Sequence, residues 1–283
     1  MKGVAKVYVR WLRDRVLSTA VWTASLVVTV VATAAFYPAL ADLSTEEISH
    51  GSEAMSSVLG LAQGIDPGSP LGYLWIGLYA NIFPWILMAL GIALGVAAIA
   101  GDEDTGTLEY LLSKPVTRTG VAIARFAGVV TILIIASLLS ALSLIVSLPL
   151  FNLDESATST VNGVSITSPG ATAMDVFNGT FASFAVAMGI AGVAFLLGSA
   201  TGRKGLAMGA ASGIAIGGYV LYTLSNMTGS LEALTWVSPW RWYVDKAMLI
   251  NGLALEVLLP FVTATVGFVA GWVLFLRRDL QNP

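Results

Sequence analysis

Long apolar stretches alternate with short polar segments along most of the chain. Each stretch has about 20 or more residues with few charges, the length that a helix needs to cross a hydrocarbon core of about 30 Å. The stretches are rich in Ala, Leu, Gly and Val and lack the strict alternation of membrane β-strands. We predict an all-α integral membrane protein with six transmembrane helices. The predicted spans are residues 16–37, 73–100, 120–148, 176–200, 206–226 and 254–276.

The composition excludes a soluble globular protein. Of the 283 residues, 56% are hydrophobic and 11% are charged, and the mean hydropathy is +0.81, whereas soluble domains carry about 25% charged residues. The spans leave little chain for a second domain, so we predict one transmembrane domain over residues 1–283. Because the chain has no cysteine and a single histidine, His50, we predict no catalytic, cofactor or metal site.

The basic residues are concentrated at one face of the predicted bundle. Six spans place both termini on the same side, and that side receives all of the basic residues except Arg241 and Lys246. The positive-inside rule therefore predicts a multi-pass protein of the cytoplasmic membrane with both termini in the cytoplasm. The basic residues assigned to the cytoplasmic face are Lys2, Lys6, Arg10, Arg13, Arg15, Lys114, Arg118, Arg125, Arg203, Lys204, Arg277 and Arg278.

The segment before the first span has the pattern of an amphipathic helix. Val7 and Trp11 fall on one face, and the cations of Lys6, Arg10 and Arg13 fall on another. Tryptophan suits the headgroup boundary and cations suit anionic lipid, so this pattern predicts an interfacial anchor. A compatible interpretation is that the same helix also forms a docking surface for a cytoplasmic partner.

The polar loop at residues 101–119 predicts a second short cytoplasmic helix. Thr105 or Thr107 can cap its N-terminus, acidic residues precede it, and Pro115 ends it. We expect Thr117 or Thr119 to cap the third span in the same way.

Leu108, Leu111 and Leu112 share one face of this short helix. Such a ridge is more than the topology requires and indicates a contact surface, although a helix that lies on the membrane surface is the alternative. Arg125 falls about one turn inside the third span, where we expect it to snorkel to the cytoplasmic headgroups.

The segment 103–125 resembles the cytoplasmic loop of ABC-2 type transporter permeases, the membrane subunits of ATP-binding cassette exporters. Those permeases typically show a Glu, then Gly-Thr-Leu-Glu, Leu-Leu-Ser and Pro-Val-Ser/Thr-Arg, and this chain has Glu103, Gly106–Glu109, Leu111–Ser113 and Pro115–Arg118. The amphipathic N-terminal helix, the six spans and the outer segment before the last span resemble the family along the whole chain.

The resemblance implies that the loop carries a coupling helix that rests on a separate ATPase subunit, with the N-terminal helix alongside. It implies two copies of that ATPase, with ATP and Mg bound by the partner, and no enzymatic activity in this chain. The implied ATPase-coupling residues are Glu103, Asp104, Thr105, Gly106, Thr107, Leu108, Glu109, Tyr110, Leu111, Leu112, Lys6, Arg10 and Arg13.

An aromatic segment precedes the last span. Trp and Tyr collect at membrane interfaces, so the segment predicts an aromatic belt. The resemblance implies instead a pair of short re-entrant helices that dip into the outer leaflet, with a break at Ser238–Pro239. The residues concerned are Trp236, Ser238, Pro239, Trp240, Trp242 and Tyr243.

A glycine occurs at every fourth position of the fifth span. This spacing aligns the glycines on one face and allows another helix to approach closely. The neighbour is either a helix of the same chain or the mate in a dimer. The residues are Gly205, Gly209, Gly213 and Gly217.

These features predict the permease subunit of an ATP-driven exporter. Because Arg125 and Glu256 lie near the ends of their spans, the sequence shows no proton relay inside the bilayer, and we expect a hydrophobic or amphipathic substrate. We expect a homodimer, or a heterodimer with a related permease, in contact with membrane lipid and without a nucleic-acid partner. One alternative is a secondary carrier or channel that uses hydroxyls such as Ser137, Ser140 and Ser143. Another is a membrane scaffold or immunity protein that binds its ligand without moving it.

Overall fold

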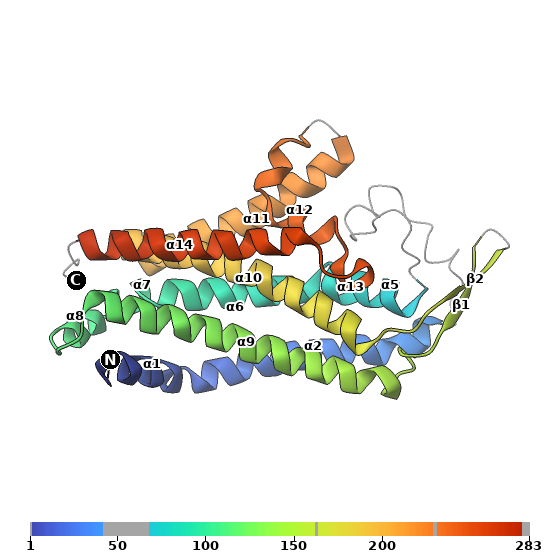
Figure 1. Ribbon diagram of the computed structural model, residues 1–283, viewed down its shortest axis with the longest axis horizontal. Coiled ribbons are helices and arrows are strands. Elements are labelled where there is room, and N and C mark those ends of the chain that lie inside the picture. Colours follow the sequence, from blue (N-terminus) through green and yellow to red (C-terminus); the bar gives the residue numbers. More distant parts are fainter. Residues whose placement is uncertain (1, 42–67, 162–163, 229–230, 279–283) are drawn as a thin grey trace.

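The computed structural model describes residues 2–41, 68–161, 164–228 and 231–278. Six helices in this part of the chain are long and apolar enough to cross a membrane, which confirms the predicted fold class. They lie roughly along the long axis of the molecule (Figure 1). The spans are α2 (Val16–Ala41), α5 (Pro70–Leu74) continued by η1 (Trp75–Tyr79) and α6 (Ile82–Ala97), α9 (Arg118–Leu150), α10 (Ala173–Thr201), α11 (Lys204–Thr228) and α14 (Leu258–Arg277).

The helix α10 is the centre of the bundle and packs against α6, α9, α11 and α14. A capping box between Thr172 and Asp175 begins it, and Gly202 ends it with a positive φ of 64°. Its backbone touches that of α14, because a Cβ added to Gly192 would lie 2.5 Å from the Cα of Ala264. Small residues allow this close approach, as is usual where lipid surrounds a bundle.

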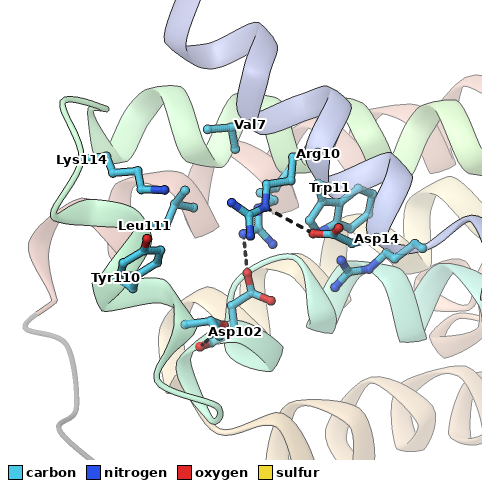
Figure 2. A pocket seen from close by; sticks show the side chains of 11 residues that line it. Val7, Arg10, Trp11, Asp14, Asp102, Tyr110, Leu111 and Lys114 are labelled. Atoms are coloured by element: carbon cyan, nitrogen blue, oxygen red, sulfur yellow. Dashed lines mark hydrogen bonds and ion pairs between the residues drawn. The ribbon is translucent and has the colours of Figure 1, made fainter.

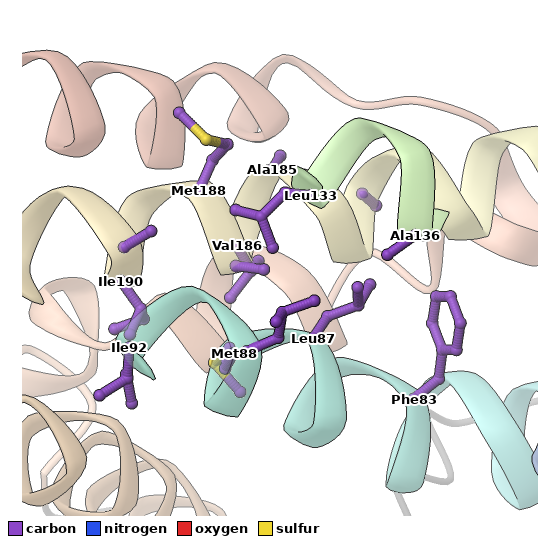
Figure 3. Packing of buried hydrophobic residues seen from close by; sticks show 14 of the residues in the cluster. Phe83, Leu87, Met88, Ile92, Leu133, Ala136, Ala185, Val186, Met188 and Ile190 are labelled. Atoms are coloured by element: carbon purple, nitrogen blue, oxygen red, sulfur yellow. The ribbon is translucent and has the colours of Figure 1, made fainter. Parts of the chain in front are cut away.

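The hydrophobic core lies between α6, α9 and α10. Phe83, Leu87 and Met88 of α6 face Leu133 of α9 and Val186 of α10 (Figure 3). All five side chains are buried. Tight packing of such side chains fixes the spacing of the three helices.

The longest helix, α9, supports the N-terminal helix α1 (Lys2–Asp14). Thr117 caps α9 by accepting a hydrogen bond from the backbone N–H of Gly120 at 3.1 Å, as predicted. The amphipathic α1 forms as expected, but Val7 and Trp11 are buried, and the Trp11 ring packs against Gly128 of α9. The apolar face of α1 is therefore covered by protein rather than by lipid.

The second span is irregular, which differs from the continuous helix predicted over residues 73–100. Ser69 caps it and Pro70 occupies the first turn, so the helix begins earlier. A π-helical turn follows at η1, and the Asn81 side-chain amide donates to the Ile76 carbonyl oxygen at 2.8 Å. The side-chain amide therefore bonds to a carbonyl oxygen that, in a regular α-helix, would accept from a backbone N–H.

A small antiparallel hairpin that we did not predict follows α9. It consists of β1 (Ala157–Val161) and β2 (Val164–Ser168), with Ala157 opposite Ser168. The hairpin lies at the end of the bundle opposite the start of α1 (Figure 1).

The aromatic segment forms short helices between α11 and α14, and α12 lies near the middle of the long axis beside α11 (Figure 1). They are η2 (Leu234–Val237), α12 (Pro239–Val244), α13 (Met248–Asn251) and η3 (Leu255–Val257). The break expected at Ser238–Pro239 separates η2 from α12, where Ser238 is the N-cap. Trp240 and Tyr243 are buried within the protein, and the Tyr243 hydroxyl donates to the Tyr79 carbonyl oxygen at 2.6 Å. These two rings therefore do not belong to a lipid-facing belt, whereas Trp236 is 55% exposed. The re-entrant position of the segment stays a prediction.

The four glycines of α11 do not pack against another helix within the described part of the chain. No atom lies within 4 Å of a Cβ added to Gly205, Gly209, Gly213 or Gly217. Packing of this face against a helix of the same chain is therefore not seen among the described residues, and contact with a dimer mate stays a prediction.

Glycines with and without room for a side chain should respond differently to an added methyl group. We expect Gly192→Ala to destabilise the fold by about 1–3 kcal/mol, because the α10 and α14 backbones must separate. Gly77→Ala is the matched control, because the nearest atom lies 3.5 Å from an added Cβ, and it should change stability by less than about 1 kcal/mol. Thermal unfolding of the purified variants in detergent measures both, and equal stability would contradict the close packing.

Candidate functional site

The start of α1 and the end of α14 lie at one end of the bundle, together with two short helices between the second and third spans (Figure 1). These are α7 (Ala100–Glu103) and α8 (Thr107–Leu112). We call this the basic end. The ATPase-coupling residues expected from the sequence all lie on α1 or on the segment from α7 to α8.

The short helix α8 begins differently from the prediction. Gly106, with a φ of 68°, occupies the N-cap position, and no side chain caps the helix. The Thr105 and Thr107 hydroxyls lie 2.9 Å apart, and Thr107 donates to the Asp102 carbonyl oxygen at 3.1 Å. These hydroxyls therefore tie α8 to the last turn of α7 instead of capping α8. The left-handed conformation at Gly106 is strained for residues with a Cβ.

The leucine ridge of α8 faces the protein itself. Leu108 is fully buried, and Leu111 and Leu112 pack partly buried against the core. Leu108 therefore does not present its side chain at the surface of this chain, and its role in ATPase coupling stays a prediction. The opposite face presents Glu109 and Tyr110 to the outside, and the Tyr110 side chain is 65% exposed.

Two ion pairs hold α7 to the neighbouring spans. Asp102 pairs with Arg125 of α9, and Glu103 pairs with Arg278 at the end of α14. Arg125 is 6% exposed, so it does not snorkel to headgroups as predicted. Because Glu103 is buried in its own pair, it too is withdrawn from the surface that a partner could touch.

A third arginine completes this connection. Arg118, the first residue of α9, donates from Nη1 to the carbonyl oxygen of Arg278 at 2.7 Å and to that of Phe275 at 3.2 Å. It therefore satisfies carbonyl groups that the C-terminal turn of α14 leaves without intrahelical partners. As a result, α7, α9 and the end of α14 form one connected unit.

A cavity of about 270 Å³ lies between α1, α7, α8 and α9 (Figure 2). Arg10 of α1 and Tyr110 of α8 both line it, so the structure brings these two predicted coupling elements together. Lys6 and Arg13 are also exposed, but they line a separate groove on α1. The cavity is lined by Val7, Arg10, Trp11, Asp14, Arg15, Asp102, Thr107, Tyr110, Leu111, Lys114 and Arg125.

Sequence reasoning missed the roles of Asp102, Arg125 and Arg278. The available signal was a pair of adjacent acids after the second span, an arginine about two turns inside the start of the third span and an arginine directly after the last span. Opposite charges at the ends of adjacent helices favour pairing over solvation when the site is partly buried.

The family model for ABC-2 family transporter proteins matches residues 7–280. No match is found among curated proteins.

The buried ion pairs should be much more sensitive to substitution than the exposed charges beside them. Asp102→Asn leaves the Arg125 guanidinium buried without a counter-charge, which typically costs about 3–5 kcal/mol. Asp104→Asn, at an exposed position two residues later, should change stability by no more than about 0.5 kcal/mol. Thermal unfolding in detergent measures the difference, and a stable Asp102→Asn variant would show that the pair is not needed for folding.

Proposed function

The chain belongs to the ABC-2 family of transporter proteins, and we propose that it is the membrane subunit of an ATP-driven exporter. The six spans and the family support a multi-pass membrane protein. The observation that carries the proposal is the exposed face of α8 beside α1. The preceding helix, α7, is joined to two spans by ion pairs. A partner that binds this face would act directly on the bundle.

We infer that the basic end lies in the cytoplasm and that the protein resides in the cytoplasmic membrane. The excess of Lys and Arg at this end supports the orientation through the positive-inside rule. The ATPase is a cytoplasmic partner in this arrangement, and it holds the ATP and Mg that drive transport.

The proposed docking surface consists of the outward face of α8 and the cationic face of α1. Glu109 and Tyr110 are exposed on α8, and Lys6, Arg10 and Arg13 are exposed on α1. Tyrosine and arginine are the residue types that most often carry binding energy at protein interfaces. A surface with both charge signs also orients its partner.

A movement of α8 reaches the membrane spans through the residues that pack beneath it. When two ATPase subunits close, they push α8, and its buried Leu108 passes the displacement to the core. The pairs of Asp102 with Arg125 and of Glu103 with Arg278 carry the same displacement to α9 and α14. The resulting tilt of the spans opens a path for the substrate.

The chain works as a dimer in this proposal, either with a copy of itself or with a related permease. The open glycine face of α11 supports it, because glycines allow a second helix to approach closely. Two permease chains would then recruit two ATPase subunits. The substrate is hydrophobic or amphipathic, in keeping with the apolar character of the spans.

Two of the three α9 hydroxyls named for a secondary carrier are bonded within their own helix. Ser140 donates to the Ala136 carbonyl oxygen and Ser143 to the Ser140 carbonyl oxygen, both at 2.8 Å. The third, Ser137, has no hydrogen-bond partner among the described residues, and the cavity beside it is otherwise lined mostly by apolar side chains of α9 and α10. One free hydroxyl in an apolar cavity is a weak basis for a polar pathway, which supports a transporter powered by a separate ATPase.

Substitutions on the outward face of α8 should separate the permease from its ATPase. We expect Glu109→Lys and Tyr110→Ala each to weaken the association by about tenfold, equivalent to about 1.4 kcal/mol. Both side chains are exposed, so the variants should still insert and fold. Glu155→Lys, the same charge reversal at the opposite end, is the matched control.

The measurement is gentle purification from the native host, followed by identification of what is retained and an assay of vanadate-sensitive ATPase activity. Wild-type retention of the ATPase by both α8 variants would reject this docking face. A chain that purifies without an ATPase and moves ions or solutes in liposomes would replace the exporter by a secondary carrier.

A further inference from the structure

The cavity between α1, α7, α8 and α9 carries more positive than negative charge. Arg10 pairs with Asp14 at 3.7 Å, and Asp102 pairs with Arg125. The two remaining cations that line the cavity, those of Arg15 and Lys114, have no carboxylate partner within the described residues. The cavity therefore has a net charge of about +2.

Three buried donor groups of the cavity lining have no acceptor. They are Nε and Nη1 of Arg125 and Nε1 of Trp11, which find no partner among the residues that the structure describes. Both side chains are more than nine-tenths buried. A buried donor without an acceptor is destabilising, because it has lost its hydrogen bonds to water. Among the same residues, no side-chain acceptor of the lining is buried without a donor. The unsatisfied groups at this site are therefore all donors.

The cations of Arg15 and Lys114 lie over aromatic rings, and Arg15 Nη2 also donates to the Ala97 carbonyl oxygen at 3.3 Å. The Arg15 guanidinium carbon lies 4.2 Å from the centre of the Trp11 ring, and Lys114 Nζ lies 4.5 Å from the centre of the Tyr110 ring. Burial lowers the pKa of Arg15, Asp102 opposes this shift, and the like charge of Arg125 adds to it. An anion beside both guanidiniums would reduce their repulsion.

The cavity lies at the level of a membrane surface. Arg15 immediately precedes the first span, which begins at Val16. The 33 residues of α9 extend for about 50 Å, well beyond a hydrocarbon core of about 30 Å. The first turns of α9, which carry Arg125, therefore reach the headgroup region.

We propose that this cavity binds a phosphate-bearing anion, and that an anionic phospholipid headgroup supplies it. The cavity of about 270 Å³ is smaller than the 300–1,000 Å³ typical of drug-sized ligands, and a headgroup phosphate is of suitable size. Arg15 and Lys114 make the charge-assisted contacts with its oxygens. The unsatisfied donors of Arg125 and Trp11, which are buried behind the lining surface, add to the attraction for an anion. The bound lipid would tie α1 to α8 and so stabilise the surface beside it.

The test uses the full purified chain in a zwitterionic detergent. Short-chain phosphatidylglycerol and inorganic phosphate are titrated separately, and the apparent Tm is followed, because a ligand that binds the folded state raises it saturably. Stabilisation by phosphatidylglycerol alone identifies the lipid headgroup as the occupant. Stabilisation by both supports the anion site and shows that free phosphate also enters.

Variants assign the binding to this cavity. We expect Lys114→Gln and Arg15→Gln each to weaken the affinity by about tenfold, since each loses one charge-assisted contact. Lys114 is exposed, so its variant should fold even if the Arg15 variant does not. Lys204→Gln removes an exposed lysine outside the cavity and is the matched control.

The absence of saturable stabilisation, or an equal loss of affinity in Lys204→Gln, would overturn the proposal. It would also be overturned if neither ligand bound while the Lys114 and Arg15 variants lost a co-purifying ATPase that the control retained. That result would assign the cavity to an acidic protein segment. Because the titration needs neither ATP nor a partner, its failure is distinguishable from failure of the proposed export function.

Discussion

The buried contact between the acids of α7 and the arginines of α9 and α14 is the constraint on which the basic end depends. Two adjacent carboxylates, Asp102 and Glu103, point to different spans and pair with Arg125 and Arg278. Charges removed from water need a partner, so each pair fixes the relative position of its two helices. The short helix α8 has little stability of its own, and its position follows from these pairs and from the buried Leu108.

The sequence predicts the spans well because their signal is strong and local. A run of some twenty apolar residues allows few structures other than a membrane helix, and the cap at Thr117 follows from the same local rules. The match of residues 7–280 to the ABC-2 family agrees with the resemblance carried by the short loop motif. The Asn-Gly pair at residues 162–163 is a hairpin signal that could have predicted β1 and β2.

The site was less predictable because its contacts join segments far apart in the chain. An apolar ridge indicates that a helix face is buried, but it does not identify the neighbour. The spacing of the leucines therefore could not assign Leu108 to the inside of the permease. Likewise, the regular glycines of α11 contact no other helix in the part of the chain that the structure describes, whereas Gly192, without such a regular series, contacts α14. Which face of a helix meets which neighbour is decided by the packing of the whole bundle.

The continuity of α9 constrains how such a protein can vary in length. The helix runs without a break from the contacts of Arg118 to the far end of the bundle. Inserting one residue into its first turns would rotate everything before it by about 100° and displace it by about 1.5 Å. Arg125 and Asp102 would then no longer face each other. Insertions and deletions should therefore accumulate around the hairpin of β1 and β2 and be rare between α7 and the first turns of α9.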